Sequence, residues 1–198
     1  MIPEIDAALS GLLTRDVLGS SQVSVTLDPP TKEWAAHRSG PTMNVFLYDI
    51  REDMRRRGAG MQAAFDERGR PTSRRPLPRV FRFSYLITAW TQRPEDEHRL
   101  LSTALRTLLR YDVLPADLLP DGPPVSLTVG LPPGEDRSFA DVWSALGGEM
   151  RASIDVVLST AYETGVPEPV DTLVTGPIQV DTGFLGEDAV GNGHASVR

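Results

Sequence analysis

The architecture rests on two aromatic-rich stretches, Pro41-Thr42-Met43-Asn44-Val45-Phe46-Leu47-Tyr48-Asp49-Ile50-Arg51-Glu52-Asp53 and Phe81-Arg82-Phe83-Ser84-Tyr85-Leu86-Ile87-Thr88-Ala89-Trp90-Thr91. The first alternates apolar residues on both faces of an extended chain, which is typical of a central or covered strand. In the second, apolar residues at every second position from Phe81 to Ala89 form one continuous face. We therefore expect Thr42 to Arg51 and Val80 to Thr91 to be antiparallel partners. Their aromatic residues Phe46, Tyr48, Phe83 and Tyr85 are expected to pack in the core.

Residues 52–79 join these two strands and are rich in glycine, proline and arginine. We expect only Met61 to Phe65 to hold a helical turn. Segments longer than about 15 residues without structure of their own are usually functional or disordered. The sequence thus predicts a long basic loop across a hairpin, and leaves open whether this loop is ordered.

The patterns outside this hairpin complete the expected fold. In chain order we expect a helix at 2–18, a strand at 23–27, a helical turn at 31–37, a helix from Pro94, a strand at 125–129, a helix from Ser138, a strand at 154–158 and an edge strand near 173–180. The helix from Pro94 carries a predicted buried stripe of Leu101, Ala104, Leu105 and Leu108. This order is neither a βαβ alternation nor an all-β array. It indicates an α+β class, with a mainly antiparallel mixed sheet and helices packed on one face.

The length and composition predict one domain at 1–182 and a flexible Gly-rich tail at 183–198. There is no cysteine among the 198 residues, which excludes a disulfide, a zinc site built on thiolates and a thiol nucleophile. Acids at positions 4 and 6 stand where a signal peptide needs positive charge. Apolar runs of membrane-spanning length are absent from the sequence. We expect a cytoplasmic protein without a membrane partner.

The net charge of −7 hides a strong asymmetry. Between Arg51 and Arg82 there are ten arginines and four acids, a local balance of +6, whereas the rest of the chain carries a balance of −13. Opposite charges on one molecule favour docking on a partner, or association of one copy with the next, at least as well as nucleic-acid binding.

Residues suited to catalysis are few. The three histidines His37, His98 and His194 lie in no recognised nucleophile, phosphate-loop or zinc-protease motif. Glu95 and His98 lie one helical turn apart, so a metal-assisted hydrolase is the weakest of the alternatives, because two ligands make a poor site. The acids Asp49, Glu52 and Asp53 are better explained by pairing with nearby arginines. We therefore predict no enzyme, and no catalytic, metal, cofactor-binding or small-molecule site.

The arginines of the loop are the candidate site. We assign a protein interface to Arg55, Arg56, Arg57, Arg70, Arg74, Arg75 and Arg79. The planar guanidinium group of arginine favours carboxylate partners in an interface. A nucleic-acid-binding loop remains the alternative, although Phe65 is the only aromatic residue that could stack on bases. A solvated loop without a partner is the third interpretation.

Six motifs occur in a fixed order along the chain: IPEIDAAL at 2–9, DPPTKEW at 28–34, NVFLYDIRE at 44–52, RFSYLITAW at 82–90, PEDEHRLL at 94–101 and WSALGGE at 143–149. Together they resemble the Pvc-type cap, or tail-terminator, family of phage-tail-like contractile injection systems, a domain formerly of unknown function. The resemblance runs from residue 2 to about residue 162.

The resemblance implies a structural protein without cofactors. Family members form a hexameric ring on the distal end of the tube and sheath, end polymerisation and hold the sheath. The implied partners are sheath and inner-tube proteins and further copies of the chain, in a particle that is retained in the cytoplasm or released. We expect an edge strand near 125–129, or the one near 173–180, to pair with the last sheath ring by strand addition.

Overall fold

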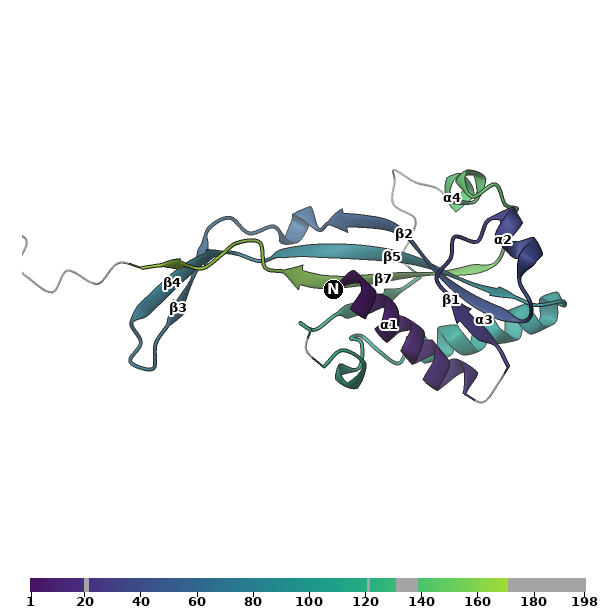
Figure 1. Ribbon diagram of the computed structural model, residues 1–198, viewed down its shortest axis with the longest axis horizontal. Helices are drawn as coiled ribbons and strands as arrows, with labels where there is room; N and C mark the ends of the chain where they lie inside the picture. Colours follow the sequence, from purple (N-terminus) through teal and green to yellow (C-terminus); the bar gives the residue numbers. More distant parts are fainter. Residues whose placement is uncertain (20–21, 121, 131–138, 171–198) are drawn as a thin grey trace, which may run out of the picture.

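The body of the molecule is a five-stranded sheet ordered β1-β2-β5-β7-β6 (Figure 1). The computed structural model describes residues 1–19, 22–120, 122–130 and 139–170. The strands are β1 (Ser24–Thr26), β2 (Thr42–Glu52), β5 (Arg79–Trp90), β6 (Ser126–Val129) and β7 (Ser153–Tyr162). β1 is parallel to β2, and all other pairs in this sheet are antiparallel. The expected mixed, mainly antiparallel α+β fold is confirmed.

The pairing of β2 with β5 is also confirmed. Thr42 lies opposite Trp90 at one end, and Glu52 lies opposite Phe81 at the other. A bulge between Leu47 and Asp49 interrupts the register once. β7 pairs along almost the whole far edge of β5, whereas β1 pairs only with Thr42 to Asn44 at the start of β2.

Two long helices, α1 (Ile2–Leu13) and α3 (Pro94–Leu108), cover one face of the sheet (Figure 1). One π-helical turn, Thr14–Leu18, continues α1. Leu9 and Leu108 are fully buried with Tyr85 and Val156 of the sheet. Leu105, which we expected to be buried, is 40% exposed. Ala104 and Leu108 face the sheet, and a residue one position further along a helix is turned by about 100°.

Two short helices, α2 (Lys32–His37) and α4 (Phe139–Ala145), lie on the other face, so the expected packing of helices on one face holds only for α1 and α3. Trp34 of α2 meets Trp90 edge-on, with 5.4 Å between the ring centroids. Trp143 of α4 is 1% exposed and packs in the same small cluster. The aromatic residues of this face therefore form a second, smaller core.

A second sheet projects beyond the ends of β2, β5 and β7 (Figure 1). It consists of β3 (Met61–Phe65), β4 (Pro71–Pro76) and β8 (Glu168–Pro169), all antiparallel, in the order β3-β4-β8. We call these three strands the arm. The helical turn expected at Met61 to Phe65 was wrong: the segment is a strand, because pairing with β4 outweighs the local helix propensity of Met-Gln-Ala-Ala. Short 3₁₀ turns at Met54–Arg56 and Ala116–Leu118 complete the described elements.

Three expectations lie outside the described residues: the edge strand near 173–180, the tail at 183–198 and a helix start at Ser138. Within the described ranges no helix is long and apolar enough to cross a membrane.

Candidate assembly interface

The seven candidate arginines all lie on the arm or where it joins the body. Most of them pair within the chain: Arg56 with Asp53 at 3.7 Å, Arg57 and Arg79 with Glu52 at 3.6 and 3.7 Å, Arg70 with Asp66 at 3.0 Å, and Arg75 with Glu163. These pairs are solvent-accessible on at least one side. Exposed ion pairs contribute about 0–1 kcal/mol each, so a partner could exchange them at small cost.

Arg55 and Arg74 differ from the other five. Both are exposed, and neither forms an ion pair with any residue that the structure describes. Arg68, at the tip of the arm and not among the seven candidates, shares this property. These three guanidinium groups are the positive charges of the arm most available to a carboxylate partner.

The tip of the arm is held by its own hydrogen bonds. The carboxylate of Asp66 accepts from the backbone N–H groups of Arg70 at 2.8 Å and Arg68 at 2.9 Å. The bond from Arg70 is the main reason why the pKa of Asp66 lies below its usual value. Gly69 takes φ +73°, which only glycine adopts readily. The turn is thus pre-organised, and the arm presents its side chains from a fixed frame.

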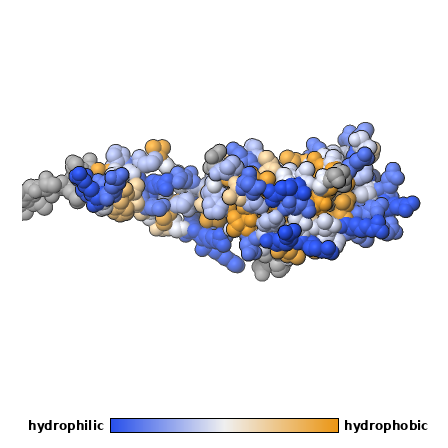
Figure 2. All heavy atoms as spheres, turned by 90° about the horizontal axis from the view of Figure 1, so that it is seen from below, coloured by the Kyte–Doolittle hydropathy of each residue, from blue (hydrophilic) through white to orange (hydrophobic). Residues whose placement is uncertain are grey.

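One face of the arm combines apolar side chains with a free charge. Met61 and Phe65 are 48% and 64% exposed and share a face of β3, since residues two apart point to the same side. Between them Ala63 lies opposite Arg74 of β4, which places that guanidinium on the same face. Figure 2 shows hydrophilic and hydrophobic residues side by side along the arm. We call Met61, Ala63, Phe65 and Arg74 the docking face.

The edges of the two sheets differ in how far they are open. β6 is an edge strand, as expected at 125–129, but the segment before it occupies part of that edge: Leu127 donates its N–H to the carbonyl of Asp112 at 2.7 Å, and Leu114 donates to that of Val125 at 2.9 Å. β1 has only three residues. The outer edge of β3 runs over five residues, and no described segment pairs with it. The outer side of β2 is likewise unpaired beyond Asn44 in the described part of the chain, because β1 pairs only with Thr42 to Asn44.

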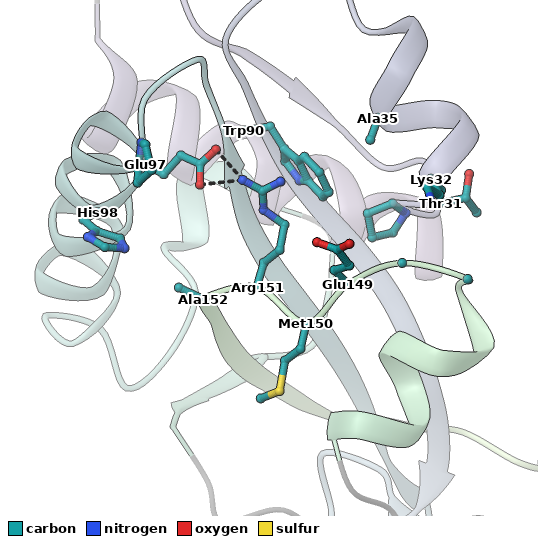
Figure 3. A pocket seen from close by; sticks show the side chains of 14 residues that line it. Thr31, Lys32, Ala35, Trp90, Glu97, His98, Glu149, Met150, Arg151 and Ala152 are labelled. Atoms are coloured by element: carbon teal, nitrogen blue, oxygen red, sulfur yellow. Dashed lines mark hydrogen bonds and ion pairs between the residues drawn. The ribbon is translucent and has the colours of Figure 1, made fainter.

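A cavity of about 600 Å³ lies between α2, the start of α3 and the segment after α4 (Figure 3). Inside it one side-chain nitrogen of Arg151 donates to both carboxylate oxygens of Glu97, at 2.7 and 2.8 Å. The guanidinium carbon of Arg151 lies 4.3 Å from the ring centroid of Trp90. Arg151 is therefore satisfied by its neighbours, and this group fastens the start of α3 to β5 and β7.

This cavity does not support the alternative metal site at Glu95 and His98. His98 lines the cavity wall, whereas Glu95 does not. Among the described residues no three histidine, aspartate or glutamate side chains gather as a metal site would require. A third ligand for Glu95 and His98 is thus missing from this part of the chain.

Sequence reasoning missed a carboxyl–phenol pair that crosses the sheet. The Tyr48 hydroxyl on β2 donates to Asp155 on β7 at 2.8 Å. Burial raises the pKa of Asp155, and burial together with this hydrogen bond raises the pKa of Tyr48. Alternation along β2 puts Tyr48 on the face of Leu86 and Trp90, but the sequence does not show that β7 brings Asp155 to the same face.

Fold and site together define an α+β domain with a projecting arm that carries exposed arginines. Residues 4–175 match the model of the Pvc16 N-terminal domain, and the chain belongs to this family. The resemblance seen in the six sequence motifs is thereby confirmed.

Solved structures share the fold. The chain is similar to the PVC sheath/tube terminator of an extracellular contractile injection system in its extended state, with a TM-score of 0.67 and 21% identity, covering 92% of this chain and 65% of that one. It is also similar to the tube terminating cap of the anti-feeding prophage, with a TM-score of 0.62 and 24% identity, covering 87% and 60%. The chain thus spans less than two thirds of either protein. No curated protein matches it.

Proposed function

We propose that the protein is a structural cap, or tail terminator, which ends the polymerisation of tube and sheath in a phage-tail-like contractile injection system. The observation that carries this proposal is the family match over residues 4–175, supported by a fold shared with a sheath/tube terminator and a tube terminating cap. The partners are sheath and inner-tube proteins and further copies of the chain. The working form is a hexameric ring, assembled in the cytoplasm into a particle that is retained or released.

The division into body and arm suits this role. The body has a packed core in which Leu9, Tyr85 and Val156 are fully buried, so it can bear load without deforming. The arm carries a docking face and an open strand edge away from that core. A protein that ends a polymer needs one surface for the last subunits and one for its own neighbours, and these two parts can serve them.

The nucleic-acid alternative is weaker than the sequence indicated. Five of the seven arginines have carboxylate partners within the chain, which lowers the charge available to phosphates. Phe65 is exposed, but no other aromatic residue lies on the arm to continue a stacking surface.

The direct test is a deletion strain examined by electron microscopy. We expect particles with irregular lengths and uncapped distal ends, and restoration of normal length by the intact chain supplied in trans. Particles of normal length with closed ends in the deletion strain would refute the cap function. Sheath, tube and baseplate genes beside this gene would support it independently.

A further inference from the structure

We propose that the outer edge of β3 in one copy of the protein binds residues 171–181 of a second copy as an added strand. The arm is then the contact through which neighbouring copies join. This deepens the ring invoked in the proposed function by naming its contact, but its test needs only the purified protein.

The backbone of β3 offers a specific set of hydrogen-bonding groups. Gly60 and Asp66, which flank β3, bond to the β4 side: Leu77 donates to the carbonyl of Gly60 at 3.3 Å, and Asp66 donates to that of Arg70 at 2.9 Å. Bonding direction alternates along an antiparallel strand. The N–H and C=O groups of Met61, Ala63 and Phe65 therefore point outward, where no described segment meets them.

The docking face selects an acidic partner with apolar side chains. A strand added to this edge brings its own side chains beside Met61 and Phe65 and close to the free guanidinium of Arg74. Main-chain bonds supply affinity in such strand addition, and alternate side chains supply specificity. The matching sequence has apolar residues flanked by aspartate or glutamate.

The last part of this chain has that chemistry. Between Ala152 and Val197 there are seven acids and no lysine or arginine. Residues 171–181 read DTLVTGPIQVD, with an aspartate at each end and four branched apolar residues between them.

Residues 163–169, which precede this segment, already place acidic side chains beside arginines at the β4 edge of the arm. β8 pairs with β4 so that Glu168 lies opposite Arg74, and Glu163 forms an ion pair with Arg75. The arm thus binds one acidic extended segment at its β4 edge, and the β3 edge offers the same chemistry without an occupant among the described residues.

The order of the strands favours a second copy as the donor. Val170 donates to the carbonyl of Thr72 on β4, so the chain leaves the arm on the side away from β3. Neighbouring strands lie about 4.8 Å apart, which puts an added strand beyond β3 about 14 Å from β8. The segment of the same copy would have to cross the arm to reach it, whereas that of a neighbour would not. The contact is head-to-tail, which is the kind that closes rings.

Cysteine cross-linking tests this contact without background, because the natural chain has no cysteine. One full-length variant carries Ala63→Cys, and a second carries a single cysteine at one position from 172 to 180, scanned in turn. The two are mixed and mildly oxidised. We expect a disulfide-linked pair of chains at alternate positions of the scan, because only those side chains lie on the face of Ala63. A Ser102→Cys variant, with its cysteine on the exposed side of α3, replaces Ala63→Cys as the control and should give no such pattern.

A chain carrying both cysteines separates the possible donors. Cross-linking within single chains, together with no product in the mixture, would show that the segment of the same copy fills the edge and would overturn the proposal. Absence of any product at every scanned position would overturn it as well. Neither result would affect the cap function, which particle length tests separately.

The contribution of charge is measured on the same protein. Arg74→Gln should lower the association constant about threefold in sedimentation at low salt, since an exposed ion pair contributes up to about 1 kcal/mol. Arg106→Gln removes an equally exposed arginine from α3 and should leave association unchanged. Equal effects of the two substitutions would contradict the assignment of Arg74 to the contact.

Discussion

The contact between Arg151 and Glu97 gives the sharpest prediction about folding. Arg151→Ala removes both hydrogen bonds to Glu97 and the cation–π contact with Trp90. Glu97 is only 8% exposed and then keeps the N–H of Thr91, at 3.0 Å, as its remaining recorded donor. Hydrogen bonds to charged groups contribute about 1.5–3 kcal/mol and a cation–π contact about 0.5–1 kcal/mol. Because the Arg151 side chain is 36% exposed, water compensates part of the loss, and we expect about 2–3 kcal/mol.

Urea unfolding followed by tryptophan fluorescence measures this loss as a lower midpoint at unchanged slope. The control is Arg99→Ala, which breaks a one-turn pair with Asp96 at 3.1 Å where the arginine is 81% exposed, and should cost less than about 0.5 kcal/mol. Arg151→Lys keeps a charge but loses the planar fork and should fall between the two. The reasoning is refuted if Arg151→Ala and Arg99→Ala destabilise the protein equally.

Three further substitutions test the body. Tyr85→Phe removes a hydroxyl that donates to Asp6 at 2.7 Å from a fully buried ring, and should lower the free energy of unfolding by about 1.5–2 kcal/mol. An unchanged free energy of unfolding would show that water replaces this hydrogen bond. Asp155→Asn keeps an acceptor for Tyr48 and removes a charge whose folded-state pKa is raised by burial. Because burial penalises the ionised carboxyl of Asp155, the variant should unfold at a higher urea concentration than the natural chain at pH 7. This difference in stability should disappear below about pH 3.9, where the carboxyl is protonated in both the folded and the unfolded state. A difference that stays constant with pH would contradict the assignment of the penalty to the charge. Leu9→Ala opens a cavity under the sheet and should cost about 3–4 kcal/mol in the same assay, and a loss below 1 kcal/mol would show that α1 collapses into the space.

The parts of the fold that local periodicity encodes could be predicted. Alternation of apolar residues identified β2 and β5 because each strand alone buries one or both faces. Helical spacing identified α1 and α3 for the same reason. The prediction that Leu105 is buried was wrong, because a hydrophobic residue beside a buried stripe can fit the helical spacing and still point to solvent.

The arm could not be predicted, and the physical cause lies in its pairing. β3 consists mainly of residues that favour helices, and β4 has a proline at each end and two arginines. What makes them strands is their hydrogen bonding to each other and to Glu168–Pro169, which follow almost a hundred residues later. The β3–β4 hairpin was missed because its residues lack a clear alternating apolar pattern, and the distant β4–β8 pairing leaves no trace in a short window of sequence.

For the candidate interface, too, the sequence reveals one part and only the fold reveals the other. The positions of the arginines are plain from the sequence, but their partners are not. Glu52 neutralises Arg57 and Arg79 because the strand end brings them together, and Glu163 reaches Arg75 from the end of β7. Only the fold reveals that Arg55, Arg68 and Arg74 keep their charges available.

Because the arm is separate from the core of the body, substitutions can be chosen that change either folding or assembly alone. Leu9 and Arg151 lie in the body, where substitutions change the free energy of unfolding. Phe65 and Arg74 lie exposed on the arm, where a substitution removes little buried area and should leave that free energy within about 0.5 kcal/mol. An arm variant that unfolds normally but no longer associates would therefore have lost an interface and not a fold. Because residues 51–82 carry a balance of +6 and the rest of the chain a balance of −13, we expect salt to weaken assembly at concentrations that leave the core unaffected.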